Sequence, residues 1–234
     1  MTRPYVAEVS SPARRERLSR ARIVQAALEI VDEQGLDALS LRGVAARLGV
    51  TPMPLYRHVA NGDELVDLVV EALLEREGRP DDLPAQWDAL LETIAWRTRS
   101  TLLRHPAVYD ALRRRALTTT SAMHGMEALL ESFDRAGLSA ADAVASYTAV
   151  LMPVLGNVAL VHGRATTLAA EGRSEREERA RVTEQLVGLD RGEYPLLAQH
   201  GGEFARLLDE DVFAWGLSVV LDGLRARLGK GRRR

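Results

Sequence analysis

The chain has 234 residues, of which 46% are hydrophobic, and this is enough to build two helical domains or one large one. It contains no cysteine, which excludes disulfides and cysteine-ligated metals, and we expect neither a cofactor nor a metal. No apolar run approaches the roughly 20 residues that a membrane helix needs, and no signal-peptide pattern opens the chain. The sequence therefore predicts a cytoplasmic protein with no membrane partner.

Charge is distributed unevenly along the chain. The formal net charge of −2 argues by itself against a nucleic-acid-binding protein. Residues 1–60, however, hold nine arginines and six acidic residues, whereas the remainder holds 22 basic and 27 acidic residues. The positive balance therefore lies at the N-terminal end of the chain, as phosphate binding by that end would require.

Basic segments lie at both ends. Residues 1–17 are expected to form a flexible basic arm, and two interpretations of it stay open. It either keeps the protein soluble, or its Arg14, Arg15 and Arg17 reach phosphates or the minor groove of DNA. Residues 229–234 are expected to be a solvated basic tail.

The first two predicted helices follow the arm. Apolar residues at helical spacing predict a helix from about residue 18 to residue 34, ended by Gly35. A second helix is predicted from Leu41 to Leu48. Ser40 would cap its N-terminus, and Gly49 would adopt the left-handed conformation just beyond its end.

A third, short helix is predicted over residues 52–59. Thr51 would cap it, and Pro52 would take the first helical position, where a missing N–H is no loss. Leu55 and Val59 are expected to face inward. Two short helices joined by a glycine turn are how many proteins present a helix to the major groove, although two packed helices with a solvated face are the alternative. The side chains expected to face outward are Thr51, Met53, Tyr56, Arg57 and His58.

The pair Asn61-Gly62 predicts a turn, after which Asp63 is expected to cap a connecting helix that ends near residue 76. An N-terminal domain over residues 18–76 would then precede a second domain over residues 77–228, with Pro80 and Pro84 at the boundary. Helical periodicity continues through the second domain, and Ser139-x-x-Asp142 is typical of a capping box. The charged run over residues 171–184 predicts a loop or a solvated helix. The other helices are expected near residues 87–102, 108–112, 120–136, 140–168 and 210–228.

Several short sequence patterns lie close together in one segment of the chain. They are Gly35, Ser40-x-Arg42, Val44-Ala45-x-x-Leu48-Gly49-Val50 and Leu55-Tyr56-x-His58-Val59. With these patterns, residues 20–70 resemble the N-terminal DNA-binding domain of the TetR family of bacterial transcriptional repressors. Glu193-Tyr194-Pro195-Leu196 and Val212-Phe213-x-x-Gly216-Leu217 resemble the C-terminal domain of the tetracycline-repressor subgroup.

The resemblance implies an all-α protein, in which a three-helix helix-turn-helix domain precedes a larger helical ligand-binding and dimerisation domain. It implies a homodimer through the helices at 140–168 and 210–228, which places two recognition helices on a palindromic operator roughly 34 Å apart. It further implies a repressor that leaves double-stranded operator DNA when a small-molecule effector tilts the helix at 63–76.

The DNA contacts that the resemblance implies fall on the helix-turn-helix segment. Ser40 and Arg42 would touch phosphate or groove edges, Tyr56 and His58 would anchor phosphates, and Arg57 could do either. Met53 and Pro54 offer only apolar contact, for example to a thymine methyl group. Asn61-Gly62-Asp63 stand where the subgroup has basic residues that contact the DNA backbone. The residues expected to face the bases are Thr51, Pro52, Met53 and Pro54.

An effector pocket in the second domain is likewise implied by the resemblance alone. Each candidate lining residue is also explained by ordinary core packing. The ligand set with which the subgroup holds a magnesium–tetracycline complex has no match here. The candidates are Trp96, His105, Tyr109, Met123, Met126, Phe133, Tyr147 and Met152.

Two other classes of function remain to be compared with the sequence. An enzyme is not expected, because the sequence has no glycine-rich phosphate loop, no GxSxG, no HExxH and no cysteine nucleophile. A constitutive dimeric DNA-binding protein without a ligand is the remaining alternative. An internal cavity of several hundred Å³ would favour ligand control, and a fully packed second domain would favour the constitutive alternative.

Overall fold

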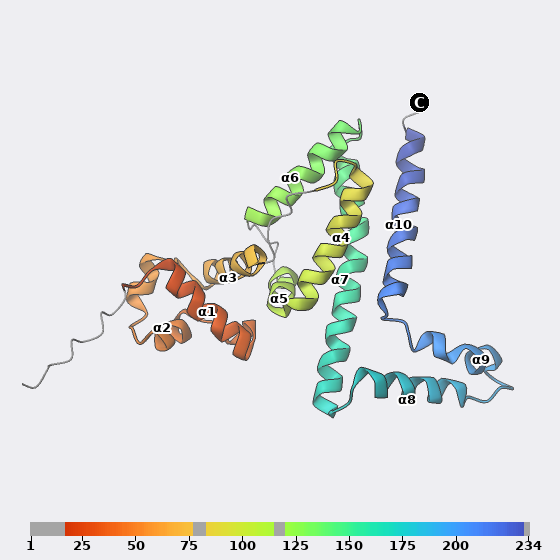
Figure 1. Ribbon diagram of the computed structural model, residues 1–234. Helices are drawn as coiled ribbons and strands as arrows, with labels where there is room; N and C mark the ends of the chain where they lie inside the picture. Colours follow the sequence, from red (N-terminus) through yellow and green to blue (C-terminus); the bar gives the residue numbers. More distant parts are fainter. Residues whose placement is uncertain (1–16, 77–82, 115–119, 232–234) are drawn as a thin grey trace, which may run out of the picture. The chain divides into compact units, whose positions relative to one another are not determined.

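The structure is a computed structural model of the single chain, and it describes residues 17–76, 83–114 and 120–231. Every regular element in these ranges is a helix, which confirms the predicted all-α fold (Figure 1). Arg14 and Arg15 of the arm, Pro80 of the expected domain boundary and the last three residues of the tail lie outside them. Contacts divide the chain into two compact units, residues 1–69 and 70–234, so the division falls within one helix.

The N-terminal unit contains α1 (Arg20–Gln34), the single turn η1 (Leu36–Ala38), α2 (Leu41–Leu48), the 3₁₀ helix η2 (Met53–Arg57) and the first half of α3 (Gly62–Arg76). Ser19 caps α1 by accepting a hydrogen bond from the amide of Arg22 at 3.3 Å. Gly35 ends the helix with a φ of 80°, a value that glycine adopts readily. The side chains at the centre of this unit are at most 1% exposed; they are Ile23, Val44, Leu55, Val59, Leu65 and Val69.

The third predicted helix is shorter and tighter than expected. The prediction of a helix over 52–59 with Thr51 as its cap was wrong: η2 covers only Met53–Arg57, and Pro52 stands at its cap position. Proline residues at 52 and 54 remove two amide donors from this short segment. Its first hydrogen bond is therefore the tight i→i+3 contact from the amide of Leu55 to the carbonyl of Pro52, at 3.0 Å.

The N-cap of α3 also differs from the prediction. Asn61, and not Asp63, caps this helix, because its Oδ1 accepts a hydrogen bond from the amide of Glu64 at 2.9 Å. Glu64 Oε2 accepts in return from the amide of Ala60 at 2.6 Å. A capping side chain reaches the amide three residues ahead of it, and Asn61 has this spacing to Glu64.

The C-terminal unit is a helical bundle with a two-helix extension. α4 packs against α5, α6, α7 and α10, and α8 packs against α9 (Figure 1). The predicted capping box of α7 is present: Ser139 Oγ accepts from the amide of Asp142 at 3.1 Å, and the Asp142 carboxylate accepts in return. The helices are α4 (Trp87–Arg104), α5 (Pro106–Arg114), α6 (Thr120–Arg135), α7 (Ala140–Glu171), α8 (Glu175–Val187), α9 (Pro195–Phe204) and α10 (Glu210–Gly231).

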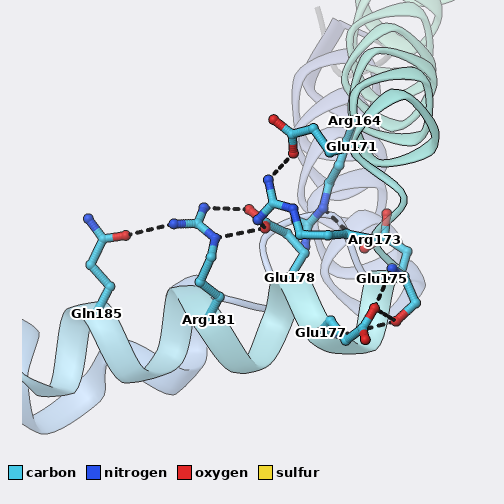
Figure 2. Close-up of polar contacts among 9 residues, drawn as sticks. Arg164, Glu171, Arg173, Glu175, Glu177, Glu178, Arg181 and Gln185 are labelled. Carbon is cyan, nitrogen blue, oxygen red and sulfur yellow. Dashed lines mark hydrogen bonds and ion pairs between the residues drawn. The ribbon is translucent and has the colours of Figure 1, made fainter.

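The charged run after α7 forms a solvated helix, α8, in which no residue is buried. Charged side chains join it to the end of α7, as Figure 2 shows. Glu178 accepts hydrogen bonds from Arg173 at 2.6 Å and from Arg181 at 2.7 Å. Arg164 of α7 lies 3.0 Å from the carboxylate of Glu175. Hydrogen bonding from Arg181 is the main cause that lowers the pKa of Glu178 to about 2.

One expectation from the sequence, that no apolar run approaches the length of a membrane helix, does not hold for α7. It is 32 residues long, and an 18-residue window within it has a mean hydropathy of 1.7, so by length and composition it could cross a membrane. Within this single chain only 22% of that window is buried. The large side chains that α7 and α10 leave exposed are Val144, Met152, Leu160, Val212, Trp215 and Val219.

Candidate functional site

The candidate DNA-reading surface is formed by α2, the turn after it and η2. Ser40 Oγ accepts a hydrogen bond from the amide of Gly43 at 3.1 Å, which confirms the predicted cap of α2. Gly49 has the predicted left-handed conformation, with φ of 66° and ψ of 32°. In the tight turn that follows, the amide of Val50 donates to the carbonyl of Ala45 at 3.0 Å. These local bonds fix how η2 follows α2.

Two apolar side chains anchor η2 from beneath. Leu55 is fully buried and Val59 is 1% exposed, as their spacing predicted. On the opposite side Met53 is 75% exposed and Tyr56 is 53% exposed. Thr51 and Arg57 are also exposed, whereas Pro52, Pro54 and His58 are half-buried. The segment thus presents apolar and hydrogen-bonding groups to solvent from a rigidly anchored turn.

Ser40 can serve the helix and a ligand at once. Its hydroxyl oxygen accepts the Gly43 amide, and its own O–H remains available to donate to an acceptor such as a phosphate oxygen. A Cβ at position 43 would lie 3.2 Å from this oxygen, so glycine there leaves the cap undisturbed. Arg42, the other residue expected at this end of α2, is exposed.

Five of the arginines in residues 17–69 fall into two groups. Arg47 pairs with Glu33 and Glu29 of α1, and Arg20 pairs with Glu64 of α3 at 2.9 Å. Within residues 17–69, the guanidinium groups of Arg17, Arg42 and Arg57 have no such partner. Cations that no carboxylate neutralises are the ones that gain most from phosphate contact. The sequence could not make this division, because periodicity does not show which carboxylate on α1 or α3 meets which arginine.

The candidate pocket residues lie in several different environments in the described part of the single chain. Phe133 is fully buried, with its ring centroid 5.2 Å from that of Trp87. Trp96 meets Phe213 edge-on at 5.1 Å, and Tyr109 lies 5.8 Å from the ring of His162. Burial raises the pKa of Tyr147, and His105 is half-buried. The exposed fractions of Met123, Met126 and Met152 are 54%, 46% and 52%.

Two hollows on the described surface are lined by other residues. One is an open depression of about 540 Å³ along α8, lined by six of its side chains from Arg176 to Val187. The other, of about 100 Å³, lies beside Trp87, Leu138 and the end of α10. Among the described residues there is also no group of three or more His, Asp or Glu side chains that could hold a metal ion.

His162 has a structural role that the sequence did not reveal. Its Nε2 lies 2.9 Å from the carbonyl oxygen of Leu102. In a continuous helix that carbonyl would accept from the amide of residue 106, but Pro106 has no amide hydrogen. The imidazole N–H donates in its place, which sets the tautomer of His162.

A buried cation in the C-terminal unit was also missed. Arg99 of α4 is 7% exposed, and its Nε donates to Asn157 Oδ1 of α7 at 2.8 Å. Its guanidinium carbon lies 4.8 Å from the ring centroid of Phe213, and one terminal nitrogen is 3.3 Å from Glu210. Arg99 therefore joins α4, α7 and α10. A polar residue at an inward-facing helical position could have indicated a buried polar contact, but the sequence does not show which residues on other helices it would contact.

Two family descriptions match this chain in succession. Residues 23–69 match "Bacterial regulatory proteins, tetR family", and residues 79–228 match "Tetracyclin repressor-like, C-terminal domain". The first match covers α1 to η2 and the start of α3, and the second covers α4 to α9 and most of α10.

Curated proteins similar to the chain are transcriptional regulators and not enzymes. The HTH-type transcriptional repressor DrrR1 of Streptomyces coeruleorubidus is 34% identical over 221 residues, which span 92% of this chain and 80% of that protein. The class A tetracycline repressor from transposon 1721 of Escherichia coli is 32% identical, over 88% of this chain and 89% of its own length. Among solved structures, ActR of Streptomyces coelicolor in complex with actinorhodin has a TM-score of 0.73 and 27% identity, over 90% of this chain and 97% of that one.

Proposed function

Because the chain belongs to the tetR family of bacterial regulatory proteins, we propose that it is a cytoplasmic repressor that binds a palindromic operator as a homodimer and leaves it when a small molecule binds. The observation that carries the DNA-binding part is the surface of α2 and η2. There Arg42 and Arg57 have no carboxylate partner, and Tyr56 is exposed from a turn anchored by Leu55.

Phosphate contacts come from residues around this turn. Ser40, Arg42, Tyr56 and His58 supply donors to the DNA backbone, and Arg57 reaches either the backbone or a base edge. Because η2 has only five residues, one of them Pro54, and follows Pro52, it has few donors to direct at bases. Base sequence is therefore read chiefly through DNA shape and through apolar contact with thymine methyl groups. The residues that make these contacts are Met53, which is exposed at the tip, and Thr51, Pro52 and Pro54.

Dimerisation uses the apolar face of α7 and α10. Trp215 is 70% exposed and Leu160 is 58% exposed, although each lies on a long helix of the bundle. Single exposed apolar residues need no explanation, but several large ones on each of two neighbouring helices support a protein interface. A second copy that covers the same face by two-fold symmetry buries this surface in both copies.

The effector is a small molecule that enters the C-terminal unit. Support comes from relatives, since ActR has been solved with actinorhodin and with (S)-DNPA. In this chain Trp96, Tyr109 and Tyr147 offer aromatic surface, and His105 offers a polar group. An effector that binds the released arrangement of α3 more tightly than the DNA-bound one lowers operator affinity by that difference.

A constitutive DNA-binding dimer is the second candidate. One observation favours it: neither of the two hollows described above is lined by a residue expected in the pocket. The two candidates differ in a direct measurement, since only a ligand-controlled repressor changes its operator affinity when a small molecule is added.

The test begins with DNA. The purified protein is used to select sequences from a randomised duplex pool, and we expect a two-fold symmetric sequence to be enriched. Arg42→Ala and Tyr56→Ala should each weaken binding to that duplex while sedimentation still shows a dimer. Unchanged affinity in both variants would contradict the assignment of α2 and η2. Addition of actinorhodin-like aromatic compounds to the complex then distinguishes the ligand-controlled repressor from the constitutive one.

A further inference from the structure

One carboxylate in the N-terminal unit joins three separate parts of the backbone. Glu64 Oε1 accepts a hydrogen bond from Arg20 Nη2 at 2.9 Å, and Oε2 accepts from the amide of Ala60 at 2.6 Å. The amide of Glu64 is itself capped by Asn61 Oδ1 at 2.9 Å. A single side chain thus connects the beginning of α1, the beginning of α3 and the segment that leaves η2.

The connection to η2 is short and continuous. The amides of His58 and Val59 donate to the carbonyl of Leu55 at 2.8 and 2.9 Å, and Ala60 follows directly. The Ala60 amide is the next donor along the chain, and Glu64 accepts it. The end of η2 is therefore held to α3 by Glu64, as its middle is held to the core by the buried Leu55.

The connection to α1 lies where the basic arm joins the folded unit. Arg20 is the first residue of α1, and Ser19 is the N-cap of that helix. Arg17, one of the arginines without a carboxylate partner, lies three positions before Arg20. The ion pair between Arg20 and Glu64 therefore lies three residues from Arg17, at the start of α1.

We propose that Glu64 is a positioning residue for DNA binding, which holds η2 and the first turn of α1 in the one arrangement that fits the operator. The proposal rests on the proposed function. A carboxylate is repelled by phosphate, so Glu64 acts through Tyr56, Arg57 and Arg17 and does not touch DNA. Base contacts require the reading groups to be placed within about 0.5 Å, whereas non-specific binding depends mainly on charge. Loss of Glu64 should therefore reduce specific binding more than non-specific binding.

Four variants separate the effect of losing the contacts of Glu64 from the effect of losing one negative charge. Glu64→Ala removes both the ion pair and the acceptor for the Ala60 amide. Glu64→Gln keeps an acceptor for that amide but removes the charge, and Arg20→Met removes only the ion pair. Asp32→Asn is the matched charge control, because Asp32 is exposed on α1 and also loses one negative charge.

The probes are the duplex that the wild-type protein selects from a randomised pool and a scrambled duplex of equal length and composition. Glu64→Ala should weaken affinity for the selected duplex by about tenfold, the size expected for one lost hydrogen bond to a charged group, and change affinity for the scrambled duplex by less than about twofold. Glu64→Gln should restore affinity for the selected duplex to within about threefold of wild type, and Asp32→Asn should change neither affinity by more than about twofold.

Equal losses on both duplexes, no loss at all, or the same loss in Asp32→Asn would overturn the proposal. If Glu64→Ala melts below the assay temperature, Arg20→Met decides: its ratio of selected to scrambled affinity should fall about threefold, and an unchanged ratio overturns the proposal. If the wild-type protein enriches no sequence, the proposed function fails and this role of Glu64 fails with it. If wild type enriches a sequence and the variants match it, only the role of Glu64 is rejected.

Discussion

Arg47 of α2 and Glu33 of α1 form a two-pronged ion pair, in which both terminal guanidinium nitrogens donate to the two carboxylate oxygens. Glu29, one turn earlier on α1, accepts a further hydrogen bond at 3.3 Å. Hydrogen bonding between the partners raises the pKa of Arg47 and lowers the pKa of Glu33. Arg47 therefore joins α2 to α1 through ion pairs, although it lies on the same helix as Arg42.

This difference predicts opposite results for two similar substitutions. Arg42→Met should reduce the slope of log K against log salt for DNA binding by about 0.9, the value for one lost phosphate contact. Arg47→Met should leave the slope unchanged, because Glu33 and Glu29 already neutralise that guanidinium. Fluorescence anisotropy titrations at several salt concentrations measure both slopes. Equal decreases in the two variants would show that Arg47 also contacts phosphate.

The sequence predicted those features of the N-terminal unit that depend on neighbouring residues. Ser40 capped α2 and Gly49 took the left-handed conformation as expected, because both roles are decided within one helical turn. The same local reasoning failed at η2, where Pro52 and Pro54 favoured a shorter 3₁₀ turn. It also placed the cap of α3 two residues too late, because Asn61 was assigned to the turn alone.

Contacts between helices could not be predicted in this way. Trp96 and Phe133 were candidates for the pocket that the resemblance implies, but the sequence did not show that Phe213 and Trp87 would be their neighbours. The pocket is expected from the resemblance alone, and its candidate residues lie in different environments within the described part of the single chain.

The ion pairs of α8 predict a dependence of stability on acid. The folded-state pKa of Glu178 is about 2, below the ordinary value of 4.5, so its contribution is present above about pH 4.5 and is lost as pH falls toward 2. Glu178→Gln should lower the unfolding temperature at pH 7 and remove this part of the acid dependence. Calorimetry of both proteins from pH 7 to low pH measures the difference, and parallel profiles would contradict the prediction.

Arg99 predicts a larger loss of stability from within the bundle. Arg99→Ala removes the donor to Asn157 and leaves unfilled space beside Phe213, so we expect it to destabilise the protein by about 3 kcal/mol. Arg99→Lys keeps the charge but not the planar guanidinium group, so its free energy of unfolding should lie between those of Arg99→Ala and wild type. Urea unfolding at fixed protein concentration measures both. A loss below about 1 kcal/mol in Arg99→Ala would show that water replaces the guanidinium without strain.

The exposed face of α10 predicts the oligomeric state. Val212, Trp215 and Val219 recur at spacings of three and four residues and are all exposed in the single chain, so they form one apolar stripe. Trp215→Glu places a charge at its centre, and burial of that charge against a second copy is strongly unfavourable. We expect light scattering to show a dimer for wild type and a monomer for Trp215→Glu. Met53→Glu, which alters an equally exposed apolar residue on η2, should remain dimeric, and a monomer in both variants would mean that the face of α10 is not the specific contact.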